Sequence, residues 1–377
     1  MKKVLIVATV QSHICQFHKP LVEVLHEIGV EVHVAARNNL AEKNGLKLDF
    51  VEKVFDVPFR RSPFSPKNIK AFKVLKKIIN DGEYDVIHCN TPVGGILTRM
   101  AAKKARKNGA KVFYTAHGFH FYKGAPLKNW LLWYPIEKHF AKRCDKLITI
   151  NEEDYNLAKN KFKTEVVRMH GVGVDENRFH TVSEEERLKL REAEGLTDKD
   201  FVILCVGELN DNKNQKMLIS AAAFVKNKIP NLKVLIAGNG IKEQELKEQV
   251  ASSGLNGIVK FLGYRKDLEN IIPFIDLGVS CSKREGLGLN LIEIMLCKKP
   301  VIATKNRGHN ELVKDGENGY LVGFDRDLLA DKIYKLSNDR ELIAKMGESG
   351  YGLAVAYSKG KILDEISSVY LGNNSYL

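Results

Sequence analysis

The stretch Ser280–Thr304 constrains the fold more than any other part of the sequence; it reads S-C-S-K-R-E-G-L-G-L-N-L-I-E-I-M-L-C-K-K-P-V-I-A-T. An apolar run of the sequence ends where this stretch begins, and a loop with two glycines follows. An apolar helix over Leu289–Cys297 then leads into a second apolar run from Pro300. Strand, loop, helix and strand in this order predict one unit of a doubly wound α/β sheet. Glu293 is the only charged residue between Gly286 and Cys297, so the helix is expected to be buried and its carboxylate to need a partner.

The loop of this stretch has the composition of a ligand site. Gly286 and Gly288 let a ligand approach the backbone closely, and the free amides at a helix start suit a phosphate group. Glu285 at the helix mouth and Glu293 two turns further on can accept hydrogen bonds from a polyhydroxyl ligand. A purely structural interpretation also fits, in which Glu293 pairs with a nearby lysine, because buried carboxylates often end in structural ion pairs.

Two glutamates with seven residues between them, the intervening G-L-G-L and the following K-P-V-I-A resemble the signature of the family 4 retaining glycosyltransferases, which have the GT-B fold. The resemblance implies an α/β protein in which two Rossmann-like, doubly wound domains face each other across a cleft. It also implies that Glu285 holds the donor sugar and Glu293 the nucleotide ribose. The donor-binding residues around them would be Gly286, Leu287, Gly288 and Leu289.

The length of 377 residues fits two domains of ordinary size. Glycines interrupt the strand–helix alternation at Gly171-Val172-Gly173-Val174-Asp175, and this segment resembles the interdomain junction of the family. We therefore predict an acceptor-side domain over residues 1–175 and a nucleotide-sugar-binding domain over 176–356. A last helix within 357–377 is expected to cross back to the first domain, as in many GT-B enzymes.

A second part of the predicted donor site follows the strand Phe201–Val206. The family usually has G-R-L here and a lysine four residues further on, and both cations neutralise the leaving diphosphate. Gly207 and Lys213 match this pattern, but Glu208 stands where the arginine is expected. Phosphate binding would then depend on Lys213 and backbone amides, or on another cation such as Lys283 or Arg284. Further positions that match family loops beside the nucleotide are Gly238, Tyr264 and Arg265, of which Tyr264 and Arg265 would contact the base through their backbone.

The predicted site residues of the first domain are histidines. His117 follows the strand Lys111–Ala116 and matches the H-G position that contacts the donor sugar in the family, where an imidazole can donate to a hydroxyl. A structural histidine is the alternative. The predicted loop Thr9–Ile14 lacks a glycine fingerprint, which argues against a nicotinamide dehydrogenase. It leaves His13 and His18 as candidate acceptor-side residues.

The excess of basic over acidic residues is confined to the first half of the chain. The net charge is +13, and residues 1–175 contain 30 Lys and Arg against 17 Asp and Glu. Much of the excess lies on the predicted helix Gly95–Asn108 and on a predicted amphipathic helix, Pro66–Asn80, whose apolar face is formed by Ile69, Phe72, Leu75 and Ile79. This distribution favours contact with an anionic membrane or a phosphate-bearing lipid acceptor, although a solvated basic face is also compatible. No nucleic-acid-binding module is evident, so nucleic acid is not expected as a partner.

The cysteines and the length of the apolar runs indicate the cellular compartment in which the protein is expected. Six scattered cysteines without a C-x-x-C pair predict reduced thiols and no zinc site of that type. No apolar run approaches the roughly 18 residues of a membrane span. The run Val4–Val10 after Met1 is too short for a signal peptide and is expected to be a buried strand. We therefore expect a cytoplasmic protein at the inner face of the cell membrane.

These features together predict a retaining glycosyltransferase that moves a sugar from a nucleotide-sugar to a hydroxyl of a lipid-linked or glycan acceptor in polysaccharide biosynthesis. UDP is the expected nucleotide by family habit. No cofactor and no metal are expected, because Lys213 and helix amides can stabilise the leaving diphosphate. Two alternatives stay open: a nucleotide-sugar 2-epimerase on the same fold, and a non-catalytic nucleotide-sugar-binding subunit, which Glu208 would explain.

Overall fold

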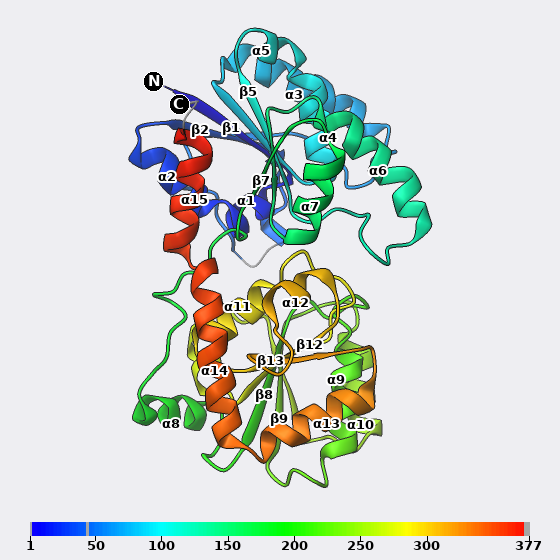
Figure 1. The fold of residues 1–377 in the computed structure, drawn as a ribbon, viewed down its shortest axis with the longest axis vertical. Helices are drawn as coiled ribbons and strands as arrows, with labels where there is room; N and C mark the ends of the chain where they lie inside the picture. The colour runs from blue at the N-terminus through cyan, green and yellow to red at the C-terminus, as the bar shows by residue number, and fades with distance from the viewer. Residues whose placement is uncertain (1, 43–44, 373–377) are drawn as a thin grey trace. The chain divides into compact units, whose positions relative to one another are not determined.

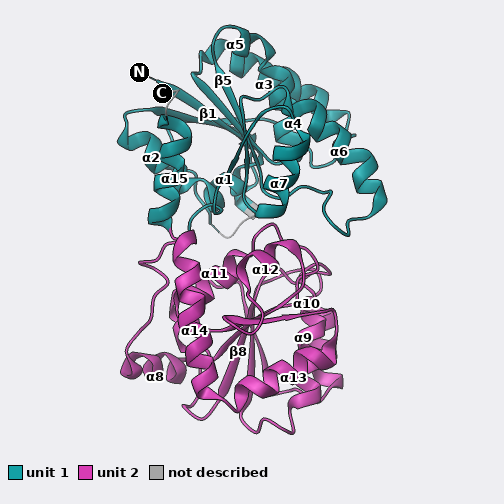
Figure 2. Cartoon of the chain, in the orientation of Figure 1, with its two compact units in different colours: residues 1–173, 359–377 teal, residues 174–358 magenta. Residues whose placement is uncertain are grey.

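The computed structural model describes residues 2–42 and 45–372. The chain divides into two compact units (Figure 2), the first formed by residues 1–173 with 359–377 and the second by residues 174–358. The boundaries lie two residues from those predicted, at 173/174 instead of 175/176 and at 358/359 instead of 356/357. Residues 359–377 therefore group with the first unit, although they follow the second in sequence.

Unit 1 contains a seven-stranded parallel sheet in the order β3-β2-β1-β4-β5-β6-β7. Its central strands are buried along almost their whole length, as expected for a parallel sheet covered on both faces. The strands are β1 Lys3–Val10, β2 Glu31–Arg37, β3 Lys53–Asp56, β4 Val86–Asn90, β5 Lys111–Ala116, β6 Lys146–Thr149 and β7 Glu165–Arg168.

Helices pack on both faces of this sheet (Figure 1). They are α1 Gln11–Phe17, α2 Lys19–Glu27, α3 Lys67–Gly82, α4 Pro92–Ala101, α5 Lys103–Lys107, α6 Leu127–Ala141, α7 Glu152–Lys161 and α15 Lys359–Leu371, with a 3₁₀ turn, η1, at Leu40–Glu42. The C-terminal helix α15 lies beside α2. Its Tyr370 hydroxyl is 2.6 Å from Nδ1 of His88, and Lys146 donates to the carbonyl of Val369 at 2.8 Å. These buried polar contacts fix α15 to the strands β4 and β6.

Unit 2 contains a six-stranded parallel sheet in the order β10-β9-β8-β11-β12-β13. Its strands are β8 Phe201–Val206, β9 Leu232–Ala237, β10 Val259–Gly263, β11 Leu277–Ser280, β12 Val301–Thr304 and β13 Gly319–Val322. Its helices are α8 Glu184–Ala193, α9 Gln215–Val225, α10 Glu243–Ser252, α11 Leu289–Leu296, α12 Arg307–Leu312, α13 Arg326–Ser337 and α14 Arg340–Ala354, with 3₁₀ turns η2 Leu268–Asn270, η3 Ile272–Phe274 and η4 Val355–Tyr357.

Three local predictions for unit 1 are wrong. The expected loop Thr9–Ile14 contains the start of α1, where Ile14 is buried and the Ser12 amide donates to Oδ1 of Asn39 at 3.0 Å, satisfying a free helix-start amide. The helix predicted over Gly95–Asn108 is two helices, because Ala102 leaves helical geometry at φ −74° and ψ 1°. Ile69 is 63% exposed and does not belong to the apolar face of α3, whereas Leu75 and Ile79 are buried as predicted, together with Ala71.

All six cysteines are free, as expected, and five of them are buried. In the part of the chain that the structure describes, no helix combines the length and the apolar character needed to cross a membrane.

Candidate active site

The predicted donor residues of unit 2 lie in the loops that follow its central strands. Lys213 follows β8 and Glu285 follows β11. Because the strands are parallel, these loops meet at one edge of the sheet, where ligands bind in doubly wound folds. The predicted site residues are thus brought together by topology alone.

Lys213 and Glu285 form an ion pair with Nζ and Oε1 2.6 Å apart. Burial opposes ionisation of Glu285, but the nearby Lys213 ammonium and a hydrogen bond from Ser282 outweigh it and lower the pKa of this carboxyl. Gly207 leaves room for the lysine stem, because a Cβ there would lie 3.1 Å from Cδ and Cε of Lys213. The pair is therefore charged at neutral pH and held in place.

Backbone hydrogen bonds join the two loops that supply this pair. The Lys283 amide donates to the carbonyl of Asn212 at 2.7 Å, and Asn212 Nδ2 donates to the carbonyl of Arg284 at 3.1 Å. Oδ1 of Asn210 accepts from the Lys213 amide at 2.9 Å. This network fixes the loop after β8 against the loop after β11, so the ammonium and the carboxylate keep their relative positions.

Glu208 does not join this ion pair. Its side chain is exposed, and Lys213 pairs with Glu285 instead. Nε2 of Gln215 donates to the backbone carbonyl of Glu208 at 3.1 Å, which holds the peptide while leaving the carboxylate in solvent. A solvated carboxylate repels a nearby anion much less than a buried one does. Glu208 is therefore a weaker obstacle to phosphate binding than its place in the sequence suggests.

Glu293 lies on α11 and is half-buried. Burial raises its pKa to about 7; Arg178 acts in the opposite direction, and Glu269 adds to the increase. Arg178 itself pairs with Glu269, at 2.6 Å between Nη2 and Oε2. Within the described ranges no ion pair joins Glu293 to a lysine, so the structural alternative drawn from the sequence is wrong. A half-buried carboxyl that titrates near neutrality is typical of a functional site.

The glycine turn after β9 has a packing role. A Cβ at Gly238 would lie 2.0 Å from the carbonyl oxygen of Gly207, and one at Gly240 would lie 2.2 Å from that of Leu209. The turn thus packs directly on the loop that leads to Lys213. Tyr264 is 46% exposed, and Arg265 pairs with Asp267 and Glu194 at 2.8 and 2.7 Å. The Arg265 guanidinium is therefore engaged within the protein, in keeping with the predicted backbone role of this loop.

The three histidines predicted in unit 1 form one cluster. Nε2 of His117 lies 3.3 Å from Nε2 of His13 and 3.0 Å from Oδ1 of the buried Asn90. The His18 ring centroid is 5.3 Å from that of His13 and 5.6 Å from that of His117. Burial lowers the pKa of all three imidazoles, that of His117 to about 4. All three are therefore neutral at physiological pH.

Both halves of the chain match glycosyltransferase family profiles. Residues 186–352 match "Glycosyl transferases group 1", and residues 3–151 match "Glycosyl transferase 4-like". The "Putative glycosyltransferase EpsD" of Bacillus subtilis is 45% identical over 372 residues, which cover 98% of this chain and 96% of the relative. The chain belongs to the family 4 glycosyltransferases.

More distant relatives agree with this assignment. An Escherichia coli UDP-Gal:alpha-D-GlcNAc-diphosphoundecaprenol alpha-1,3-galactosyltransferase is 27% identical over 345 residues, covering 89% of this chain and 88% of the relative. The crystal structure of Anabaena HepE in complex with UDP matches with a TM-score of 0.79 at 24% identity, covering 98% of this chain and 99% of that one. The glycosyltransferase WaaG matches with a TM-score of 0.75 at 15% identity, covering 97% and 99%. The fold is GT-B, as predicted.

Sequence reasoning missed two residues of this glycosyltransferase site, Arg307 and His309 on α12. Nε of the buried Arg307 donates to the carbonyl of Glu285 at 3.4 Å. His309 is also buried; its Nδ1 donates to the carbonyl of Thr304 at 2.7 Å, so Nε2 can accept from the Ser280 hydroxyl at 3.1 Å. Their position just after the strand β12 is the signal that would have identified them.

Gly308, between these two residues, explains why α12 lies so close to the Glu285 loop. A Cβ at Gly308 would lie 2.8 Å from the Leu287 amide nitrogen and 3.0 Å from Cβ of Glu285. The missing side chain thus permits direct contact between the helix start and the loop. Arg307 is a buried cation beside the backbone of Glu285, which neither Lys283 nor Arg284 is, since both of these are exposed.

Proposed function

We propose that this glycosyltransferase moves a sugar, with retention of anomeric configuration, from a UDP-sugar to a hydroxyl of a lipid-linked or glycan acceptor in polysaccharide biosynthesis. The observation that carries the proposal is the charged Lys213–Glu285 pair at the carboxyl edge of the unit 2 sheet. Its Glu285 lies in the loop that leads into α11, the helix that contains Glu293. Support for the donor and acceptor comes from two relatives, one a UDP-galactose-dependent enzyme acting on a diphosphoundecaprenol-linked sugar and one crystallised with UDP.

Each side chain of the pair has a separate task in the proposed reaction. The bond between the anomeric carbon and the diphosphate oxygen breaks, and its electron pair leaves with the diphosphate. The acceptor oxygen forms the new bond to the same carbon, and its proton passes to the leaving diphosphate. Lys213 stabilises the charge that develops on this diphosphate, so no metal is needed. Glu285 accepts hydrogen bonds from the sugar hydroxyls, and Glu293 accepts them from the ribose. A sugar contact by His117 stays a prediction.

The first experiment is a thermal-shift panel of nucleotide-sugars on the wild type, Glu293→Ala and the control Lys216→Ala. A ligand at 100 times its dissociation constant stabilises the protein by about 2.7 kcal/mol, which shifts the melting temperature measurably. We expect one UDP-sugar to stabilise the wild type and the control but not Glu293→Ala. Release of free UDP with extracted lipids present, and not without them, would then identify a transferase. Conversion of the donor without acceptor would identify an epimerase, and absence of any turnover a binding subunit.

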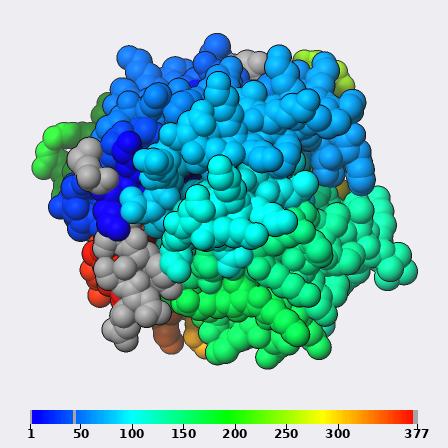
Figure 3. All heavy atoms as spheres, turned by 90° about the horizontal axis from the view of Figure 1, so that it is seen from above, coloured from blue at the N-terminus to red at the C-terminus, as the bar shows by residue number. Residues whose placement is uncertain are grey.

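We further propose that unit 1 contacts an anionic membrane through α3 and the loop before it. Phe64 is 74% exposed and Ile69 is 63% exposed, in a segment rich in exposed Lys and Arg side chains. Exposed apolar side chains between cations suit an anionic bilayer surface, where each cation contributes about 1 kcal/mol. Figure 3 shows one face in a space-filling view, much of which is covered by the blue-to-cyan segments of unit 1. Five exposed lysines lie on α3: Lys67, Lys70, Lys73, Lys76 and Lys77.

Co-sedimentation with vesicles tests this contact. Replacing four of the five α3 lysines, Lys70, Lys73, Lys76 and Lys77, by glutamine should release the protein from vesicles containing phosphatidylglycerol and leave its weak binding to neutral vesicles unchanged. The matched control replaces four exposed lysines of unit 2, Lys189, Lys216, Lys247 and Lys345. Equal binding of both quadruple variants and the wild type would disprove the contact.

A further inference from the structure

The histidine cluster of unit 1 brings together residues from three separate segments. His13 lies on α1, His18 lies between α1 and α2, and His117 follows β5. One ring nitrogen of each lies within 4.8 Å of the corresponding atom of the other two. The chain contains 11 histidines, so convergence of three on one point by chance is improbable. Neighbouring imidazoles that can all present a lone pair are a typical transition-metal arrangement.

The spacing of two of these nitrogens fits a tetrahedral ion. Zinc binds imidazole nitrogen at about 2.0–2.1 Å, and at the tetrahedral angle two such nitrogens are about 3.3 Å apart. Nε2 of His13 and Nε2 of His117 are 3.3 Å apart. An ion between them needs little rearrangement of either ring, and His18 needs to approach by about 1–1.5 Å from the 4.8 Å limit to complete a set of three.

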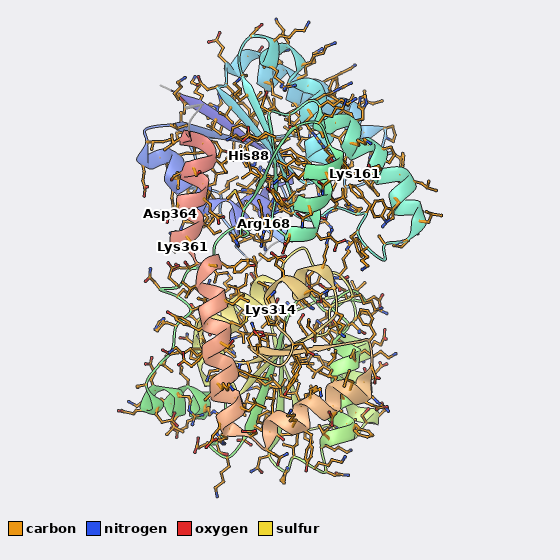
Figure 4. All side chains as sticks on the ribbon, in the orientation of Figure 1. His88, Lys161, Arg168, Lys314, Lys361 and Asp364 are labelled. Carbon is orange, nitrogen blue, oxygen red and sulfur yellow. The ribbon has the colours of Figure 1, made fainter. Side chains whose placement is uncertain are left out.

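His18 supplies independent support. Its Nε2 is buried and has no hydrogen-bond partner, which is rare for a polar atom inside a protein. By contrast, the neighbouring His88, labelled on the sheet of unit 1 in Figure 4, uses both nitrogens, on the Tyr370 hydroxyl at 2.6 Å and the Thr115 hydroxyl at 2.7 Å. His88 is therefore satisfied by the fold, whereas His18 is left with an unused nitrogen.

Space beside the cluster is compatible with an ion. A cavity of about 30 Å³, which is room for one ion or one water, is lined by His18 and His117 together with His88, Thr115 and mostly apolar side chains. His13 is not among the lining residues, but its Nε2 lies 3.3 Å from Nε2 of His117.

We propose that His13, His18 and His117 bind one Zn²⁺ ion, with a fourth position left for water or a substrate hydroxyl. Binding places the His117 proton on Nδ1 and replaces the hydrogen bond from its Nε2 to Asn90, whose Oδ1 then faces the ion. Three histidines with one open position form a complete zinc-binding set.

A consequence for catalysis rests on the proposed function. With the ion on Nε2 of His117, this nitrogen can no longer donate a hydrogen bond to the donor sugar, its predicted contact, and zinc thereby inhibits transfer. Zinc binding is a separate statement about unit 1 and does not depend on that role.

Zinc binding is measured on the chelator-treated full-length protein by titration calorimetry and by the visible absorption of the Co²⁺ form. We expect one site per chain and intense absorption bands typical of tetrahedral cobalt. His13→Gln and His18→Gln should each weaken binding by about 100-fold, since each removes one of three ligands. Matched controls are His26→Gln, an exposed histidine of α2, and Cys15→Ser, which removes the half-buried thiol on α1. Both should bind zinc like the wild type. Far-UV circular dichroism checks that every variant is folded.

Each outcome decides the proposal. Absence of a wild-type site, or equal binding by both histidine variants, overturns it, and loss of binding only in Cys15→Ser assigns the ion to the thiol. A site that binds zinc without any loss of UDP-sugar turnover keeps the zinc proposal and removes the catalytic role of His117. Zinc binding with a protein that shows no turnover at all leaves the site intact and counts against the proposed function alone.

Discussion

The two units have the same type of fold, but the polar cluster beyond the strands is charged in unit 2 and neutral in unit 1. Beyond its strands, unit 2 holds an ammonium and a carboxylate 2.6 Å apart and a second carboxyl with a pKa of about 7. In unit 1, the corresponding cluster contains only neutral imidazoles and an amide. Both units are built on a parallel sheet, of seven strands in unit 1 and six in unit 2, so a few loop residues decide whether the site is charged or neutral. A charged site suits a diphosphate, whereas a neutral one suits sugar hydroxyls or a metal ion.

The largest expected effect comes from removing the cation of unit 2. Lys213→Ala should lower turnover by about 100- to 1,000-fold, because the leaving diphosphate loses its charge partner and Glu285 is left unpaired. Steady-state release of UDP measures the effect. Lys216→Ala, an exposed lysine one residue into α9, is the matched control and should stay within about twofold of the wild type.

If Lys213→Arg keeps part of the turnover that Lys213→Ala loses, the result would support a role of Lys213 through its charge. A loss below tenfold would show instead that Arg307 and the backbone amides carry the phosphate, and the contrast between the two units would then rest on α12.

The next effect compares the buried ion pairs that each unit contains. Arg99 pairs with Glu137 in unit 1 and Arg191 with Asp276 in unit 2, both at 2.8 Å. Removing either arginine leaves a buried carboxylate unpaired and should lower the free energy of unfolding by about 3–5 kcal/mol. Arg191→Ala should be the more damaging, since Arg191 also donates to the carbonyls of Phe274, Thr197, Asp198 and Asp200.

Urea unfolding can assign each loss to its unit. Both tryptophans, Trp130 and Trp133, lie on α6 in unit 1, so their fluorescence reports on that unit, while far-UV circular dichroism reports on both. Arg99→Ala should shift the fluorescence transition to lower urea concentration. Arg191→Ala should leave the fluorescence transition in place and shift the part of the dichroism signal that comes from unit 2. Arg326→Ala, at an exposed pair with Asp327, is the control and should change little. Coincident shifts for both variants would show that the units unfold together.

A smaller effect is the pH dependence of donor binding. The pKa of Glu293 is about 7 without ligand, so this carboxyl is mostly protonated at pH 6 and mostly ionised at pH 8. If the ribose hydroxyls donate to the ionised form, UDP affinity rises with pH by about tenfold between these values. In the ligand-free protein the sign is opposite: the folded pKa exceeds the unfolded one, so the protonated carboxyl favours the folded state at low pH. That stability falls as pH rises through 7.

Titration calorimetry with UDP at pH 6, 7 and 8 measures the affinity. Glu293→Gln should bind with little pH dependence, and His180→Gln, at an exposed histidine of unit 2, should keep the wild-type profile. An identical pH profile in Glu293→Gln would assign the titration to another group and remove Glu293 from the ribose site.

Much of this site was predictable because its geometry follows from topology. Glu285, Glu293 and Lys213 could be placed from spacing after apolar strands, since parallel strands bring their following loops to one edge. The role of Arg307 could not, because it depends on Gly308 allowing α12 to lie against the Glu285 loop. Nor could the meeting of His13, His18 and His117: α1 was expected to be a loop, and only its helical geometry orients His13 toward His117.

The smallest expected effect separates packing from contact in the loops beside the nucleotide. Tyr264→Ala should change UDP affinity by less than about twofold, because a site formed by the backbone does not use this exposed ring. Gly238→Ala should be far more harmful, since its φ of 147° strains an alanine and the added Cβ would meet the Gly207 carbonyl at 2.0 Å. UDP titration of both variants, with Gly257→Ala as a control for glycine strain in open space, measures the difference. A large loss in Tyr264→Ala would mean that its ring stacks on the base. UDP affinity would then depend on an aromatic contact as well as on the charged groups that distinguish unit 2 from unit 1.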